Sequence, residues 1–351
     1  MSGSASFDLG PPEQSAGSLF LKSQFLTSPQ WPPADTNLSG KVAIVTGSSS
    51  GLGLEASRQL LSFGLSTLIM AVRSPGKGED VATTFRTEFP EADVRVWPLE
   101  MESYASIQDF ARRVDAELPR LDIAILNAAL QMANHVPVTS TGHEKLIQVN
   151  YLSTTLLAIL LLPLLKAKSS DPRLSIVSSG TARGASLNIP PGTPILPSLD
   201  DQTKPYDPVE RYAVSKLLGH LFLLELVLRY VRAEDVVVNL VDPGLVKNTD
   251  LQRGAPFLID AFFTSFKAIF GRTVPVGAST YVDAVAVKGK ESHGCFLSNW
   301  KISPFAAFLY TPEGEAARKQ LWKETMEELE FASVEAILDD LKSLKAQSRT
   351  D

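Results

Sequence analysis

The chain has 351 residues, of which 44% are hydrophobic, and 39 Asp and Glu against 33 Lys and Arg give it a formal net charge of −6. An acidic chain gains nothing from counterion release on phosphates, so the charge argues against a general nucleic-acid-binding role. The single cysteine, Cys295, excludes an internal disulfide and any cysteine-based metal site. It is compatible with a reducing compartment, so we expect a cytoplasmic protein.

The first 38 residues are rich in Ser, Gly and Pro, which is typical of an extension or arm. They have neither the basic start nor the apolar run of a secretory signal. The pairs Phe20-Leu21 and Phe25-Leu26 indicate that part of the arm packs on the body. We therefore expect an arm over 1–38, one domain over 39–330 and a helical tail over 331–351.

Short apolar runs alternate with helical patterns after the arm. The runs are continuous rather than alternating, as in parallel strands that are buried on both faces. Strands are predicted at 41–46, 66–72, 94–99, 121–127, 174–178 and 236–241, and helices at 53–63, 79–88, 103–117, 141–166 and 209–231. This alternation predicts an α/β fold of the Rossmann type, with a doubly wound parallel sheet in a single domain.

A glycine-rich turn, residues 46–53 (TGSSSGLG), follows the first predicted strand. Glycines permit a tight turn and close backbone approach, and the next helix presents free N–H groups to a pyrophosphate. The alternative is a plain structural turn, because any strand-to-helix turn favours glycine. The residues expected to bind a dinucleotide here are Gly47, Ser49, Ser50, Gly51, Leu52 and Gly53.

The residues at the end of the second predicted strand indicate which cofactor is bound. An acid about 20 residues past the glycines binds the ribose of NAD, whereas an arginine accommodates the 2′-phosphate of NADP. This strand ends in Ala71-Val72-Arg73-Ser74, which offers an arginine and no carboxylate. Arg73 therefore predicts NADP(H) as the cofactor, although a solvated surface arginine is the alternative.

Two long loops are candidates for function, because such loops are uncommon in compact domains. The first, 180–211, is rich in proline. The second, 251–271, contains an aromatic patch that we expect to form a lid and pocket wall for an apolar substrate, or to contact a membrane surface peripherally. Its members are Phe257, Phe262, Phe263, Phe266 and Phe270.

Tyr212 and Lys216 open the helix at 209–231 and share one of its faces, being four residues apart. A nearby ammonium favours phenolate, so we expect Lys216 to move the pKa of Tyr212 from about 10 toward neutrality. Tyr-x-x-x-Lys is common by chance, and by itself it more often marks two exposed residues than a site.

Taken together, these motifs resemble the short-chain dehydrogenase/reductase family, whose turn is T-G-x-x-x-G-x-G. The resemblance covers about residues 38–325 and includes Leu321-Trp322, a pair seen in retinol-dehydrogenase-like members and their fungal relatives. It implies a single-domain NADP(H)-dependent oxidoreductase that moves a hydride to or from a carbonyl or alcohol carbon. We expect a medium-sized apolar substrate and a tailoring step in fungal secondary metabolism.

The resemblance also implies the site residues. Tyr212 would donate the proton, Ser179 would orient the substrate oxygen, Lys216 would hold the ribose hydroxyls, and Asn150 would support a water chain; Ser178 is the second choice for the serine. Glu100 occupies the position where the family usually has Asp, and Thr249 lies one residue further along the chain than the threonine of the family pattern. The further cofactor contacts implied are Glu100, Asn127, Ala128, Pro243, Gly244, Val246 and Thr249.

Several alternatives remain open. One is a non-catalytic NADP(H)-binding regulatory protein, another is a retinol- or steroid-like dehydrogenase, and an epimerase of nucleotide sugars is disfavoured by the glycine spacing. The four histidines lack partners at metal-ligand spacing, so no metal is expected, and His220 is expected to be packed or at an interface.

The helices at 141–166 and 209–231 are apolar nearly all round, which is typical of buried helices. In related enzymes these two helices build a dimer's four-helix interface, so the resemblance implies a homodimer. The alternative is that the chain's own arm covers them. The longest apolar run, 152–165, is shorter than the roughly 20 residues that span a bilayer, so no transmembrane segment is expected.

Overall fold

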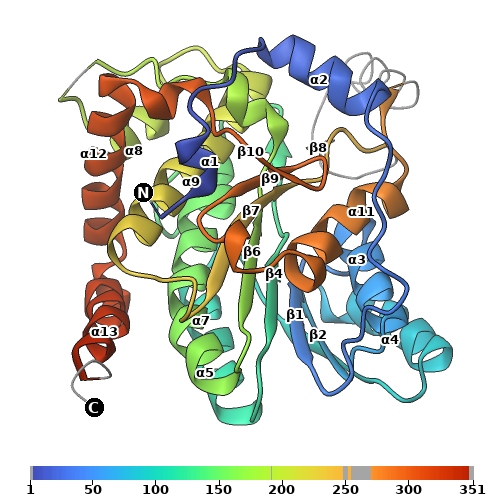
Figure 1. Cartoon of the computed structure of the whole chain (residues 1–351). Coiled ribbons are helices and arrows are strands. Elements are labelled where there is room, and N and C mark those ends of the chain that lie inside the picture. Colours follow the sequence, from blue (N-terminus) through green and yellow to red (C-terminus); the bar gives the residue numbers. More distant parts are fainter. Residues whose placement is uncertain (1–2, 191, 248–251, 254–269, 348–351) are drawn as a thin grey trace.

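A computed structural model describes residues 3–190, 192–247, 252–253 and 270–347, without the side chains of 252–253 and 343–347. Its main sheet has the strand order β10-β9-β7-β6-β4-β1-β2-β3 (Figure 1). All neighbouring strands are parallel except β9 and β10. The strands are β1 (Val42–Thr46), β2 (Thr67–Val72), β3 (Asp93–Pro98), β4 (Ile123–Leu126), β6 (Arg173–Val177), β7 (Val237–Asp242), β9 (Phe296–Ser298) and β10 (Lys301–Ser303).

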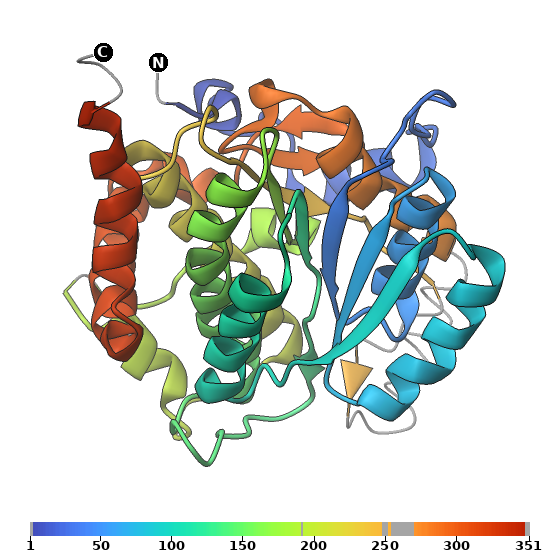
Figure 2. The same ribbon diagram turned by 90° about the horizontal axis from the view of Figure 1, so that it is seen from below.

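The predicted α/β fold is confirmed, and its helices form two layers with the sheet between them (Figure 2). One layer holds α3 (Gly51–Ser62), α4 (Pro75–Glu88) and α11 (Val274–Val282). The other holds α5 (Tyr104–Glu117), α7 (Thr154–Lys168) and α9 (Pro208–Arg229). The strand order reverses beside β1, which lies between β2 and β4. Ligands of such sheets bind at that reversal, beyond the carboxyl ends of the strands.

The helix predicted at 141–166 has three parts. It begins as α6 (Lys145–Ile147), widens into the π-helix η1 (Gln148–Ser153) and continues as α7. The run Lys145–Lys168 is long and apolar enough to cross a membrane, but 89% of its most apolar window is buried inside the molecule. That burial is typical of a core helix.

Two C-terminal helices, α12 (Pro312–Glu328) and α13 (Val334–Gln347), cover the outer faces of the second layer. α12 packs on α9 and α13 packs on α7. Trp322 stacks between Phe222 and Tyr230, with ring centroids 5.6 and 5.1 Å away. The faces that the sequence assigned to a dimer's four-helix interface are thus covered by the C-terminal helices of the same chain. A homodimer of this chain needs a different contact surface.

The arm is fastened to the body by hydroxyl groups. Beside α1 (Ala5–Asp8), Ser4 Oγ donates to the carbonyl of Gly294 over 2.6 Å. The amide of Phe296 donates to Ser6 Oγ over 2.8 Å. Of the two hydrophobic pairs noted in the sequence, Phe20 is half-buried, whereas Leu21 and Leu26 are 55% and 79% exposed. The arm's second helix, α2 (Ala16–Phe25), lies above the carboxyl edge of the sheet (Figure 1).

The remaining elements are short. A second sheet pairs β5 (Gln131–Met132) with β8 (Gln252–Arg253). The proline-rich segment holds the 3-10 helix η2 (Gly180–Gly184) and the helix α8 (Ile195–Asp200). The others are η3 (Asp283–Val287), η4 (Lys290–Ser292), η5 (Ala307–Tyr310) and η6 (Glu330–Ala332).

Replacing Leu338 by alanine tests whether α13 belongs to the core. Leu338 is fully buried in the same hydrophobic cluster as α7, so Leu338→Ala leaves a cavity and should lower the free energy of unfolding by about 3 kcal/mol. Urea unfolding measures this, with Asp339→Ala on the exposed face of α13 as the control. Equal stability of the two variants would mean that α13 is only loosely attached.

Candidate active site

The glycine-rich turn is held tightly at the end of β1. Gly47 has a φ of +66°, which favours glycine. A Cβ on Gly53 would lie 2.5 Å from both the carbonyl oxygen of Gly47 and Nδ2 of Asn127, so only glycine fits there. Asn127, directly after β4, donates from Nδ2 to the carbonyl of Thr46 over 2.9 Å and to the carbonyl of Gly47 over 3.4 Å. The turn, the start of α3 and two strand ends are thus fixed together.

A cavity of about 750 Å³ opens beside this turn, within the size range of ligand pockets. It is lined at one end by Gly47, Ser49, Ser50, Gly51 and Leu52, whereas Gly53 packs beneath the turn instead. Further expected residues that line the cavity are Arg73, Glu100, Asn127, Ala128, Ser179, Tyr212, Lys216, Pro243, Gly244 and Val246.

Two cations line the cavity on the side of β2, whose residue Ala71 accepts from the amide of Gly47 over 2.8 Å. Arg73 follows β2 and is exposed, and Lys77, in the first turn of α4, lines the cavity beside it. The sequence argument missed Lys77, although a lysine four residues after the arginine could have been noticed. Glu100 lines the same side, and its Oε1 accepts from the amide of Glu102 over 3.1 Å.

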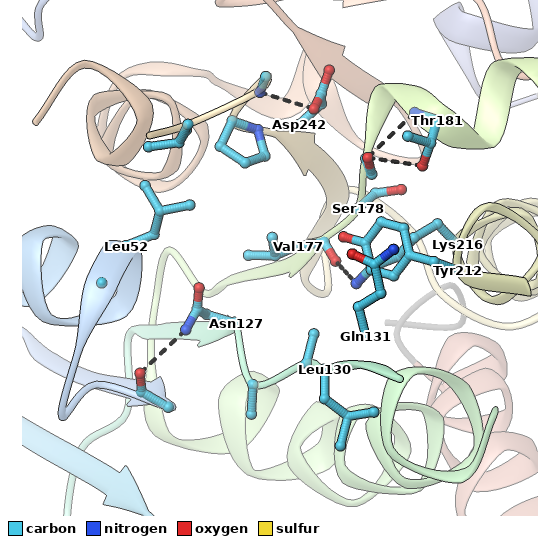
Figure 3. A pocket seen from close by; sticks show the side chains of 18 of the residues that line it. Leu52, Asn127, Leu130, Gln131, Val177, Ser178, Thr181, Tyr212, Lys216 and Asp242 are labelled. Carbon is cyan, nitrogen blue, oxygen red and sulfur yellow. Dashed lines mark hydrogen bonds between the residues drawn. The ribbon is translucent and has the colours of Figure 1, made fainter. Parts of the chain in front are cut away.

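Tyr212, Lys216 and Ser179 meet at the middle of the cavity. Lys216 Nζ donates to the carbonyl of Val177, the last residue of β6, over 2.9 Å (Figure 3). The same nitrogen lies 5.7 Å from the ring centroid of Tyr212. The hydroxyl of Ser179, two residues beyond β6, hydrogen-bonds the Tyr212 phenol and accepts from the amide of Thr181 over 3.2 Å.

The pKa of Tyr212 does not move in the direction expected from the sequence. Burial raises it and the carboxylate of Asp242 raises it further, while the hydrogen bond from Ser179 opposes both. Burial lowers the pKa of Lys216 to about 8. The expectation fails because the ammonium is directed at the carbonyl of Val177 and because desolvation of the phenolate is the larger effect.

Asn150 lies in the π-helix η1, beside the cavity rather than in its lining. Its Nδ2 donates to the carbonyl of Leu130 over 2.9 Å and to Ser215 Oγ over 3.1 Å, and its Oδ1 accepts from the amide of Leu130 over 2.9 Å. Ser215 Oγ in turn donates to the carbonyl of Tyr212 over 2.7 Å. The side-chain amide of Asn150, which we expected to hold a water chain, is thus hydrogen-bonded to Leu130 and Ser215. Through Ser215 it is connected to the backbone of Tyr212. Sequence reasoning missed Ser215.

Ser178, the second choice for the catalytic serine, already has a partner. Its hydroxyl lies 2.9 Å from Nε2 of His220, a fully buried ring that packs against Phe296. Burial lowers the pKa of His220 to about 3, so the ring is neutral. His220 is therefore packed, as expected, and it engages Ser178 rather than Ser179.

The segment after β7 forms one wall of the cavity. Asp242 accepts from the amide of Gly244 over 2.9 Å and from Ser298 Oγ over 3.1 Å. Gly244 has a φ of +75°, which turns Pro243, Gly244 and Val246 along the cavity. The expected contact Thr249 lies outside the described residues, as do Phe257, Phe262, Phe263 and Phe266.

The N-terminal arm forms another wall, which the sequence did not reveal. The cavity-lining residues of α2 are Ala16, Leu19, Phe20, Ser23 and Gln24. Arg272 holds this helix in place by donating from Nη2 to the carbonyl of Ser23 over 2.9 Å and from Nη1 to the carbonyl of Pro243 over 3.2 Å. Phe270 lies edge-on to Phe25, with the ring centroids 5.5 Å apart.

Comparisons with known proteins agree with this arrangement. The family model for short chain dehydrogenases matches residues 41–190. The short chain dehydrogenase/reductase mfmJ of Annulohypoxylon moriforme is 51% identical over 92% of this chain and 94% of its own length. The short chain dehydrogenase virL of Hypocrea virens is 46% identical over 92% and 94%. A short chain dehydrogenase of Escherichia coli CFT073, solved with NADPH, superposes with a TM-score of 0.55 over 76% of this chain and 99% of its own, at 23% identity.

Replacing Arg272 by methionine tests how the arm is held. Arg272→Met removes the donors that bind Ser23 and Pro243, so α2 should open more often and trypsin should cut after Lys22 at least several-fold faster. Timed proteolysis followed by mass spectrometry measures this, with Arg112→Met, an exposed arginine on α5, as the control. Unchanged cleavage in Arg272→Met would show that other contacts hold the arm.

Proposed function

This chain belongs to the short-chain dehydrogenase/reductase family, and we propose that it is an NADP(H)-dependent oxidoreductase of carbonyl and secondary alcohol groups. The observation that carries the proposal is the meeting of Tyr212, Ser179 and Lys216 in the same cavity as the glycine-rich turn. A phenol, a hydroxyl and a cation beside a dinucleotide cradle form a site for moving a proton at an oxygen while the neighbouring carbon changes oxidation state.

The residues present fit a dinucleotide. The turn lacks Cβ atoms where a backbone must approach closely, and α3 begins at Gly51 with free amides toward the cavity. Arg73 and Lys77 offer two cations to a 2′-phosphate, which favours NADP over NAD. The solved E. coli relative crystallised with NADPH supports the same choice.

When bound, the reduced nicotinamide would supply the hydride. Tyr212 donates its proton to the carbonyl oxygen of the substrate, and the high pKa given to it by burial keeps it protonated until that oxygen becomes basic. Ser179 holds the same oxygen through its hydroxyl. Lys216 provides a cation beside the phenolate that remains. Because the phenolate charge develops only in the transition state, the cation stabilises the transition state more than the ground state.

Asn150 holds neighbouring groups in position and takes no part in the reaction itself. Through Ser215 it fixes the backbone carbonyl of Tyr212, and through Leu130 it fixes the loop after β4. We place the reaction in the cytoplasm, on a medium-sized and largely apolar molecule, as a tailoring step of fungal secondary metabolism. The apolar side chains Leu19 and Phe20 of the arm and the two fungal relatives support this choice.

Removing the phenol oxygen tests the proton donor. Tyr212→Phe keeps the ring and the cavity, so it should retain NADPH binding while turnover falls by about 10²–10⁴-fold. NADPH fluorescence titration and NADPH oxidation with a panel of ketones and aldehydes measure the two properties. Tyr104→Phe on α5, which loses a hydroxyl bonded to Glu328, is the control. Near-normal turnover by Tyr212→Phe would rule out this tyrosine as the acid.

Removing the arginine after β2 tests the cofactor preference. Arg73→Ala should weaken NADPH binding by roughly 10- to 100-fold and change NADH binding little, because only NADPH carries the 2′-phosphate. Titration of both nucleotides into the wild type, Arg73→Ala and Arg112→Ala gives the comparison. Equal losses for NADPH and NADH would count against this role of Arg73.

A further inference from the structure

Arg183 is a half-buried cation that the proposed reaction does not use. It lies in η2, four residues after Ser179, and it lines the same cavity. One face of its guanidinium packs over the ring of Phe296, 4.9 Å from the ring centroid. The stacking holds the side chain in place but uses none of its N–H groups.

The donors of Arg183 lack partners in the described part of the chain. Its Nε is buried without a hydrogen bond, and no described residue makes a hydrogen bond or ion pair with its side chain. A guanidinium carries five N–H donors and stays charged, and a buried donor without a partner, such as this Nε, is unfavourable. Arg272, by contrast, donates to two backbone carbonyls and to Ser23 Oγ.

The charges around Arg183 leave an excess of positive charge. Asp242 is the carboxylate that favours its charged form, but the two make no salt bridge, and the oxygens of Asp242 accept from Gly244 and Ser298. His220 is neutral, Tyr310 is a protonated phenol, and Lys216 adds a second cation. Burial lowers the pKa of Arg183, and the carboxylate of Asp242 opposes this effect only in part.

The position of Arg183 separates it from the phosphate-binding end. It follows β6, and β4 lies between β6 and β1, where the glycine-rich turn begins. Two strand spacings amount to about 10 Å. Arg183 shares its turn with Thr181 and with Ser179, the serine of the proposed reaction.

We propose that Arg183 binds an anionic oxygen of the substrate, a carboxylate or a phenolate, while the carbonyl of that substrate lies at Tyr212 and Ser179. The proposal rests on the proposed function and narrows its substrate class. The substrate has an acidic group at one end, and its apolar body packs against Leu19 and Phe20 of the arm. A planar guanidinium is well suited to such oxygens.

Binding of small anions tests the proposal without turnover. Benzoate and para-nitrophenolate are titrated calorimetrically into the whole protein, with and without NADP⁺, beside their uncharged methyl derivatives, methyl benzoate and para-nitroanisole. We expect the wild type to bind at least one anion ten or more times more tightly than its methyl derivative. Preference for benzoate identifies a carboxylate, and preference for para-nitrophenolate identifies a phenolate.

Variants then assign the preference to this side chain. In Arg183→Gln the dissociation constant of the methyl derivative should become nearly equal to that of the anion, so that their ratio falls close to one. Arg183→Lys should keep part of it, and Arg112→Gln on the exposed face of α5 should keep all of it. If the glutamine variant does not fold, the preference of the wild type and its partial loss in Arg183→Lys still decide the matter.

The two proposals fail separately. No preference for either anion in the wild type, or a preference that survives in Arg183→Gln, would overturn the role of Arg183 even if ketones are reduced. Absence of nucleotide binding and of Tyr212-dependent turnover, with the anion preference intact, would overturn the oxidoreductase proposal and leave the anion site standing.

Discussion

The parallel direction of β1, β4, β6 and β7 is the constraint on which the rest depends. Because the strands run the same way, their carboxyl ends lie at one edge, and the segments that follow them meet there. The glycine-rich turn follows β1, Asn127 follows β4, Ser179 follows β6 and Asp242 ends β7. One edge thus brings together residues that are nearly 200 positions apart in the sequence.

Burial then gives these groups their chemical character. The side chain of Tyr212 is half-buried and that of Lys216 is buried, and this burial favours the uncharged form of each. A proton donor that ionises reluctantly releases its proton only when an oxygen beside it gains negative charge. Arg183 cannot respond in this way, because a guanidinium keeps its charge, and its unpaired donors therefore indicate a ligand.

The two ends of the chain complete the domain in different ways. The C-terminal helices α12 and α13 cover α9 and α7, which are too apolar to face water. The arm instead reaches the functional edge, where Arg272 ties α2 to the wall of the cavity. The first arrangement stabilises the core, whereas the second shapes the space open to a substrate.

The sequence by itself determined the parallel strands from β1 to β7 in the main sheet, the glycine-rich turn and the pair Tyr212 and Lys216, because these depend on local periodicity and on spacing within single elements. It did not predict the short strands β9 and β10. Only the tertiary structure decided the direction of the pKa of Tyr212, the partners of Asn150, the covering of α7 and the place of α2 in the cavity. Desolvation and long-range contacts are set by which segments meet in space. No pattern within one segment records that meeting. The phenylalanines of the arm indicated that it packs on the body, but neither its place at the cavity nor the unpaired Nε of Arg183 gave a signal in the sequence.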